Sequence, residues 1–270
     1  MAPTPSSISA HTARDALTVF VIAFAHAKDT RAAITKRLAT HGLSPTFIDA
    51  VDGRIIQETE RAQHLNPERR KFLARILSPG ALGCSLSHQH AWQALLDSNA
   101  DCALILEDDA ILSNSAHSVL NHLATRATDF DIVTLHHYKH RPLHLIDKLP
   151  SDHELSVARY NQIGAIAYMV SRDAAARLLV SSAPITFEID VYMNRWWEHG
   201  ISNLLVYPPI AQEDGRASTI GYTDKQPVWA DDSLLLRLYR RINRMKDSMQ
   251  KRLRFSAYLG KIQNNWHSGR

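Results

Sequence analysis

The sequence predicts a mixed α/β domain, with a Rossmann-type sheet flanked by helices, followed by a basic amphipathic helix at the carboxyl end. Three observations lead to this prediction. The first fifty residues have the pattern strand, helix, strand; three acids at 107–109 directly follow a short buried strand; and beyond residue 231 apolar residues recur every three to four positions among arginines. We expect residues 1–18 to be a disordered leader, 19–225 the main domain and 226–270 a helical tail.

The elements follow from local signals taken in order. The β-branched and aromatic run at 19–22 predicts a strand, residues 28–41 carry apolar positions at helical spacing, and residues 46–51 predict a second, parallel strand that ends at a turn. Ser78 and Pro79 form a helix start, with the serine as N-cap and proline in the first turn. Further strands are expected at 102–106, 131–135, 165–170 and 203–207, and further helices at 79–97 and 172–182.

Composition limits the class of protein. With 270 residues and 45% hydrophobic content, the chain can bury a large core, and its longest apolar runs fall short of the ~20 residues that span a bilayer. The two cysteines, Cys84 and Cys102, lie in apolar periodic segments, which favours buried thiols and a reduced, cytoplasmic location. The formal charge of +4 is concentrated in the tail, where residues 231–270 carry ten Lys or Arg and three Asp.

The acidic triplet Glu107, Asp108 and Asp109 is the first candidate site. Carboxylates at the carboxyl end of a strand lie where open α/β sheets bind ligands. In an extended chain Glu107 and Asp109 share one face and Asp108 points to the other, so two carboxylates converge on one cation. Oxygen ligands select hard ions, Mg²⁺ or Mn²⁺, that hold a diphosphate. A solvated acidic turn explains the same three residues without any ligand.

Five separated blocks, in the same order, make the chain resemble glycosyltransferase family 25, the lipooligosaccharide-biosynthesis glycosyltransferases that include collagen galactosyltransferase domains. The blocks are residues 19–22 with Asp29 and Arg31 after them, 47–53, 77–88, 104–109 and 164–171.

The resemblance implies a GT-A-like fold whose D-x-D-type motif, here Glu107-x-Asp109, binds a divalent metal (Mn²⁺ or Mg²⁺) and a UDP-sugar. Asp109 would be the direct metal ligand, with Asp108 or Glu107 reaching the ribose or a metal-bound water. The family inverts anomeric configuration, which implies a general base on the acceptor hydroxyl and positive charge on the departing diphosphate. The expected reaction moves a hexose, galactose above others, to a saccharide acceptor in lipopolysaccharide or other surface-glycan biosynthesis.

Further residues are candidates for donor contacts. Asp29 and Arg31 follow the first strand, where arginine suits bidentate phosphate contact, although a helix N-terminal charge pair explains them equally. Asp52 lies where uridine contacts are expected, or serves the turn alone. Ser87, His88 and Gln212 complete the set, and Asp214 lies in the same block as Gln212; for His88 a purely structural role stays open.

Asp190 is the candidate general base, because it stands where the family has an acid downstream of the metal motif and because burial in an apolar run raises a carboxyl pKa. Two alternatives remain: Asp190 caps the following helix, or Glu188 or Glu213 is the base. The chain also departs from the family in Ile22-Ala23-Phe24, where the family has Ile-Asn-Leu, and in Ser85, where it has an aromatic residue.

The tail has the pattern of a helix that lies on an anionic membrane, through residues 235–255 at the inner face of the cytoplasmic membrane, where lipid-linked acceptors are found. Packing of the same stripe on the main domain or on another subunit is the alternative. Nucleic-acid binding is not expected, because no aromatics interleave the basic stretch. Two other classes compete with the transferase: a metal-dependent hydrolase, which would need no acceptor, and a non-catalytic sugar-binding protein.

Overall fold

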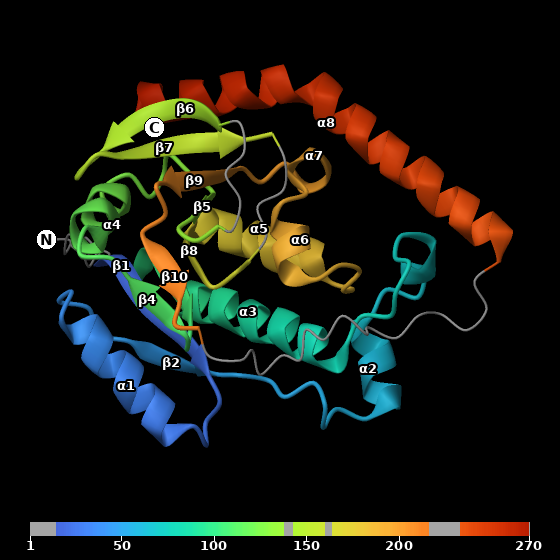
Figure 1. Cartoon of the computed structure of the whole chain (residues 1–270), viewed down its shortest axis with the longest axis horizontal. Coiled ribbons are helices and arrows are strands. Elements are labelled where there is room, and N and C mark those ends of the chain that lie inside the picture. Colours follow the sequence, from blue (N-terminus) through green and yellow to red (C-terminus); the bar gives the residue numbers. More distant parts are fainter. Residues whose placement is uncertain (1–14, 138–142, 160–163, 216–232, 270) are drawn as a thin grey trace, which may run out of the picture.

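The computed structural model describes residues 15–137, 143–159, 164–215 and 233–269, and in it helices cover both faces of one mixed sheet (Figure 1). The strand order is β2-β1-β3-β8-β5-β9-β7-β6, and β10 pairs separately with β4. The strands are β1 (Asp15–Ala23), β2 (Thr46–Asp49), β3 (Ala100–Glu107), β4 (Ala110–Leu112), β5 (Ile132–Thr134), β6 (Leu143–Leu149), β7 (His153–Ala158), β8 (Ala167–Ser171), β9 (Asn203–Tyr207) and β10 (Ala211–Glu213).

The helices largely match the predicted segments and add several short ones. They are α1 (Lys28–Ala39), α2 (Glu58–His64), the 3-10 turn η1 (Arg69–Lys71), α3 (Pro79–Asp97), α4 (Ala116–Ala124), α5 (Arg172–Ser182), α6 (Ile189–Met193), α7 (Trp196–His199) and α8 (Leu234–Ser268). Ser78 caps α3 as expected, because its hydroxyl accepts from Ala81 N, and Ser171 caps α5 in the same way through Ala174 N.

The predicted strand–helix–strand unit is confirmed. β1 pairs in parallel with β2 on one side and with β3 on the other. The three strands therefore end at the same edge of the sheet. β8 runs antiparallel to both β3 and β5, which makes the sheet mixed.

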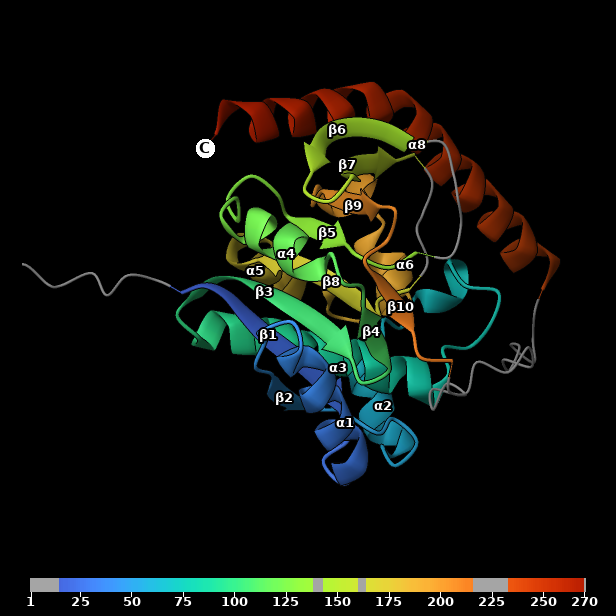
Figure 2. The same ribbon diagram turned by 60° about the vertical axis from the view of Figure 1, so that its left-hand side comes forward.

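Alternation along β1 explains why both faces are covered. Val19 and Val21 join a core cluster with side chains of α1, α4 and α8, whereas Phe20 and Ile22 join a second cluster with side chains of α3, α5 and α6. Figure 2 shows the two helical layers on opposite sides of the strands. β1 is apolar on both faces because helices pack against it on both sides of the sheet.

The amino-terminal boundary differs from the prediction. β1 begins at Asp15, so residues 15–18, which we expected in a disordered leader, belong to the sheet and pair with β3. The rest of that predicted segment, 1–14, lies outside the described residues. The composition of residues 15–18 predicted irregular structure. Hydrogen bonding to β3 nevertheless makes these residues part of a strand.

The predicted basic helix at the carboxyl end is also present. α8 is a single helix of 35 residues. It begins beyond the sheet, beside η1, and its second half crosses the outer surface of β6 (Figure 1). Its second half contributes Phe255, Ile262 and Trp266 to the main core. Among the described residues, no helix has the length and apolar character needed to cross a bilayer.

Candidate donor-sugar site

A pocket opens at the edge where the parallel strands β1, β2 and β3 end. Its wall comes from residues 22–24 at the end of β1, residues 50–54 after β2, four residues of α3, and Glu107 and Asp108 at the end of β3. The space among these residues is about 590 Å³ when the open solvent at its mouth is included. The carboxyl ends of parallel strands are the usual ligand position in open α/β sheets.

Two glycines bring the loop after β2 against α3. A Cβ on Gly53 would lie 1.8 Å from the carbonyl oxygen of Pro79, and a Cβ on Gly83 would lie 2.3 Å from that of Val51. Both obstacles are backbone, so only glycine permits this approach. Ser87 fastens the same contact: its hydroxyl accepts from Val51 N at 2.8 Å and donates to Gly83 O at 2.7 Å. The predicted donor contact of Ser87 stays a prediction, but its hydroxyl already has two protein partners.

Asp52 presents a carboxylate at the pocket mouth. Its oxygens accept from the Nε and Nη2 atoms of Arg54, each at 2.7 Å, and Oδ1 also accepts from Arg54 N at 3.0 Å. The side-chain hydrogen bond to Arg54 holds the pKa of Asp52 below its usual value. Asp52 and Arg54 both line the pocket, so the site has a charged pair where the sequence predicted a single uridine contact.

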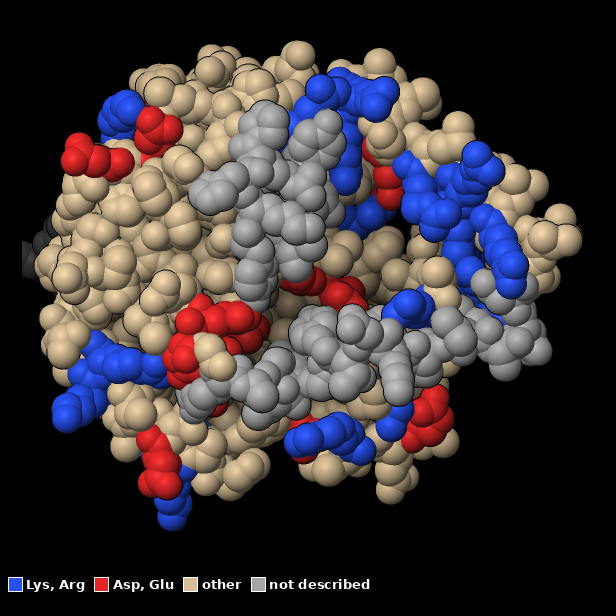
Figure 3. Space-filling model, viewed as in Figure 1, with Lys and Arg blue, Asp and Glu red and all other residues tan. Residues whose placement is uncertain are grey.

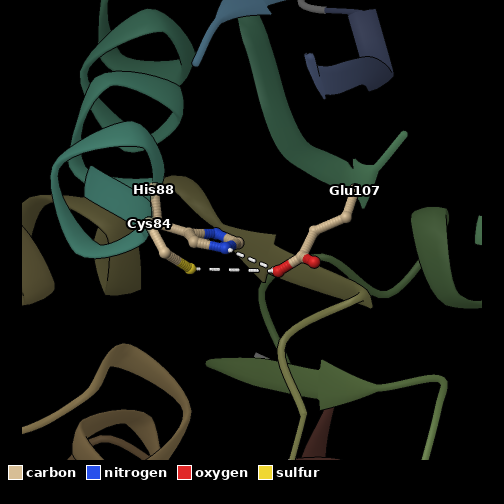
Figure 4. Close-up of side chains that lie close together, drawn as sticks. All are labelled: Cys84, His88 and Glu107. Atoms are coloured by element: carbon tan, nitrogen blue, oxygen red, sulfur yellow. Dashed lines mark hydrogen bonds and ion pairs between the residues drawn. The ribbon is translucent and has the colours of Figure 1, made fainter. Parts of the chain in front are cut away.

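His88 is fully buried and links the pocket to a hydrogen-bonded chain behind it. Trp92 Nε1 donates to the Tyr168 hydroxyl at 2.9 Å, and the same hydroxyl lies 2.9 Å from His88 Nδ1. Burial raises the pKa of Tyr168 well above its usual value, so the hydroxyl stays protonated. The donor in the contact between Tyr168 and His88 follows from the histidine tautomer, and the tautomer with its proton on Nε2 accepts at Nδ1. Nε2 lies 3.5 Å from Glu107 Oε1 (Figure 4). That spacing is an ion-pair distance, longer than a well-formed hydrogen bond.

Cys84 lies beside the same carboxylate, with Sγ 3.9 Å from Glu107 Oε1 (Figure 4). Cys84, His88 and Glu107 have their ligand atoms within 4.8 Å of one another, a spacing that suits a metal ion. A thiol binds metal as the thiolate, however, and burial with the charges of Glu107, Asp190 and Glu188 raises the pKa of Cys84 well above its usual value. A thiol ligand suits softer ions such as Zn²⁺, so for Mg²⁺ or Mn²⁺ the oxygen ligands around Asp109 are the better candidates.

Asp109 is the most perturbed acid of the site. Burial, and then the charges of Glu107, Asp108, Glu213 and Asp214, raise its pKa to about 7. Its Oδ1 atom is buried and has no hydrogen-bond partner among the described residues. A divalent cation fits such a group, since it would satisfy the oxygen atom and neutralise the cluster with the oxygen ligands that Mg²⁺ and Mn²⁺ prefer.

The arrangement of the acidic triplet corrects one expectation. β3 ends at Glu107 and a turn holds Asp108 and Asp109, so strand alternation does not extend through the motif. Glu107 and Asp108 line the pocket, whereas Asp109 faces β10, where Asp214 N donates to the Asp109 carbonyl at 2.9 Å. The turn replaces the extended chain because β4 folds back at once to pair with β10. Figure 3 shows acidic side chains gathered on the face that carries β10.

Asp190 lies in the first turn of α6, buried, and accepts from Gly164 N at 3.1 Å. Burial raises its pKa, with backbone hydrogen bonds opposing the shift and Glu107 adding to it. The N-cap position of α6 is Glu188, so Asp190 does not cap this helix. Of the alternative bases, Glu188 lies near enough to Cys84 to shift its pKa, and Glu213 is beside Asp109.

Comparison with known proteins decides the family. The family model described as glycosyltransferase family 25 (LPS biosynthesis protein) matches residues 16–193, more than half of the chain. The chain belongs to glycosyltransferase family 25. The matched region includes every strand that ends at the pocket, the acidic triplet and Asp190.

Similar proteins of this family include both active and inactive members by name. Procollagen galactosyltransferase 1 of Danio rerio is 22% identical over 244 residues, which are 80% of this chain and 40% of that protein. Inactive glycosyltransferase 25 family member 3 of Mus musculus is 25% identical over 243 residues, again 80% of this chain and 40% of that protein. The chain thus spans less than half the length of these relatives. A crystal structure of a glycosyltransferase involved in the glycosylation of the major capsid of PBCV-1 is similar over 70% of this chain and 80% of that one, with 11% identity and a TM-score of 0.38.

Three of the predicted donor contacts, Asp29, Arg31 and Gln212, are not brought to the pocket, and Asp109 and Asp190 are also not among its lining residues. Asp29 is exposed in the first turn of α1, and Gln212 is exposed on β10. Arg31 donates to the carbonyls of Ala23 and Phe24, at 2.7 and 3.1 Å, and pairs with Asp49. Because Ala23 and Phe24 line the pocket, Arg31 supports its wall from behind. Donor contacts by these three stay predictions.

The two departures from the family pattern differ in their consequences. Ala23 and Phe24 line the pocket, so the first departure changes its wall. Ser85 is buried and donates to Ala81 O at 3.0 Å, and it is not among the pocket residues. Its difference from the family's aromatic residue therefore lies behind the pocket.

Besides Arg54, two site residues were missed by the sequence analysis. Cys84, interpreted as an ordinary buried thiol, is half-buried in the pocket wall. Arg37 of α1 donates to Asp108 O at 3.1 Å and lies 3.4 Å from Asp214 Oδ2, so it brings a cation to the acidic cluster. Its position in the last turn of a predicted helix gave no signal, because only the fold brings α1 alongside β4.

Proposed function

We propose that the pocket binds a UDP-sugar with a divalent cation, Mn²⁺ or Mg²⁺, and that the chain transfers the hexose, galactose above others, to a saccharide acceptor with inversion. The observation that carries the proposal is the acidic cluster beside the pocket, in which Asp109 has a buried oxygen with no hydrogen-bond partner among the described residues. Membership of the family and the galactosyltransferase named among the relatives support the choice of reaction and sugar.

In this scheme Glu107 and Asp109 would hold the cation, whose charge would offset that of the departing diphosphate. Asp52 and Arg54 face the nucleoside at the mouth, and the Nε2 proton of His88 keeps Glu107 oriented. The acceptor hydroxyl loses its proton to Asp190, whose raised pKa makes it a stronger base than an ordinary carboxylate. The acceptor is a lipopolysaccharide or other surface glycan, as the family description suggests. The proposed membrane contact through residues 235–255 lies on α8, which does not line the pocket.

The proposal is tested by thermal shift and UDP release with the purified full chain. UDP-galactose, UDP-glucose, UDP-N-acetylglucosamine and a non-uridine control are each added with Mn²⁺ or with EDTA, to the wild type and to Asp109→Ala. We expect stabilisation and UDP release that require both cation and UDP-sugar and are lost in the variant. No response to any nucleotide sugar, or an unchanged response in Asp109→Ala, would refute the site.

The same assay separates the two competing classes. A hydrolase would release free sugar at a rate that added acceptor does not change, and a sugar-binding protein would be stabilised without turnover. For the base, Asp190→Asn should keep the donor-induced stabilisation and lose at least about 100-fold in turnover, whereas Glu188→Gln and Glu213→Gln, the matched controls, should lose far less. Loss confined to either control would move the base to that residue.

A further inference from the structure

The two halves of α8 differ in how they contact the rest of the protein. From Phe255 onward the helix packs on the sheet and buries three large side chains in the main core. Before Phe255, the only buried residue of the helix is Arg240. The first half therefore buries no apolar side chain against the body.

These polar contacts all come from one side of the helix. Arg240 Nε donates to Arg70 O at 2.9 Å, Asn243 Nδ2 donates to Lys71 O at 3.2 Å, and Asp247 pairs with Arg195 at 2.9 Å. Residues 240, 243 and 247 are spaced by three and four, so they share a face. This face fixes the helix on η1 and α7.

The opposite face carries a continuous row of large apolar side chains. Seven residues of the row are between 53% and 81% exposed. At 100° per residue they form one stripe that points away from the body. In a helix of a globular protein the apolar stripe ordinarily faces the core, so this orientation is reversed. The exposed stripe comprises Leu234, Leu235, Leu238, Ile242, Met245, Met249 and Leu253.

The charges beside the exposed stripe have one sign. α8 carries nine Lys or Arg and a single acid, Asp247, which is on the body side and paired. Arg241 and Arg252 border the stripe on one side and Lys246 on the other. Figure 3 shows basic side chains gathered where this half of the helix lies.

We infer that the exposed stripe of α8 inserts into the interface of an anionic phospholipid bilayer, with Arg241, Arg252 and Lys246 at the headgroups. A bilayer supplies an apolar phase for the stripe and negative charge for its borders. A second copy of the chain would cover the apolar residues but would bring two sets of arginines together. Charge complementarity thus selects the membrane, and the inference is independent of the chemistry in the pocket.

Vesicle cosedimentation of the full chain tests the inference. We compare vesicles of phosphatidylcholine alone with vesicles that contain phosphatidylglycerol, at about 0.1 M and about 1 M salt. The variants are Leu238→Glu with Met245→Glu in the stripe, Arg241→Glu with Arg252→Glu at its border, and Val180→Glu, an equally exposed apolar residue on α5, as the matched control.

We expect binding to the anionic vesicles only, weakened at high salt, reduced at least about tenfold by each double variant and unchanged in the control. All the substituted side chains are exposed, so the unfolding midpoints should stay equal. The inference is overturned if anionic vesicles are not bound or if the double variants bind as well as the wild type. A dimer in light scattering that the stripe variant dissolves would also overturn it, by assigning the stripe to a second copy.

Discussion

Replacing Asp109 by asparagine should stabilise the protein in the absence of divalent cations. The carboxyl pKa of Asp109 is raised from 3.8 to about 7 in the folded chain, and an unfolded chain has no reason to raise it. Between about pH 4 and about pH 7 the folded state therefore holds a proton that the unfolded state has lost. The free energy of unfolding falls as pH rises through this window and is level above it.

The magnitude follows from the size of the shift. About three pKa units at 1.36 kcal/mol each give a ceiling of about 4 kcal/mol, and solvent screening of a half-buried group reduces this to about 2 kcal/mol. For a chain of this size that is a rise in Tm of about 4–8 °C. Asparagine keeps the shape of the protonated acid and removes only the charge.

The assay is thermal unfolding in EDTA at about pH 8 and about pH 4.5, with Glu60→Gln, an exposed acid of α2, as the control. We expect the gain of Asp109→Asn to be about 2 kcal/mol at the higher pH and to shrink to about 1 kcal/mol at the lower, where the unfolded carboxyl is already partly protonated. Added Mn²⁺ should reverse the order, since only the wild type gains the binding free energy of the cation. An equal gain at both pH values would show that packing rather than charge is responsible, and a loss at the higher pH would refute the electrostatic argument.

Two further predictions concern the wall behind the pocket. Tyr168→Phe removes the partner of two buried groups, Trp92 Nε1 and His88 Nδ1, so we expect a loss of about 2–4 kcal/mol in urea unfolding together with weaker donor binding; unchanged stability would contradict the assigned chain. Burial raises the pKa values of Cys84 and Cys102, to about 12 for Cys102. Iodoacetamide at about pH 8 should therefore leave both thiols unlabelled in the folded chain and label both in denaturant, as read by mass spectrometry. Fast labelling of Cys84 in the folded chain would disprove the protonated thiol.

Much of the fold was predictable because local signals and tertiary packing agree. α3, α5 and β9 occupy the predicted segments, and the serine caps mark where both helices begin. The hairpin of β6 and β7 was missed. Its turn places Ser151 and Asp152 at positive φ, 58° and 59°, without the glycine or asparagine that usually signals such a turn. The register and the edge position of this hairpin depend on β9, which the sequence does not reveal.

The site was predictable only where it depends on strand ends. The acids after β3 and the turn after β2 were found because parallel strands end at one edge. The approach of Gly53 to α3, the pairing of β4 with β10 and the reach of Arg37 are contacts between segments distant in sequence. No local sequence pattern indicates these contacts. They nevertheless decide which acids face the pocket.

The acidic cluster and the fixed pocket wall act together. Glycine contacts and the Ser87 hydrogen bonds hold the loop after β2, so the wall has little freedom to move away from the carboxylates. The hydrogen bond from Asp214 N fixes the Asp109 backbone beside β10, and Arg37 donates to Asp108 O and pairs with Asp214. The repulsion that lowers stability without metal is therefore the same free energy that gives the site affinity for a divalent cation, and the cation should bind before or with the diphosphate.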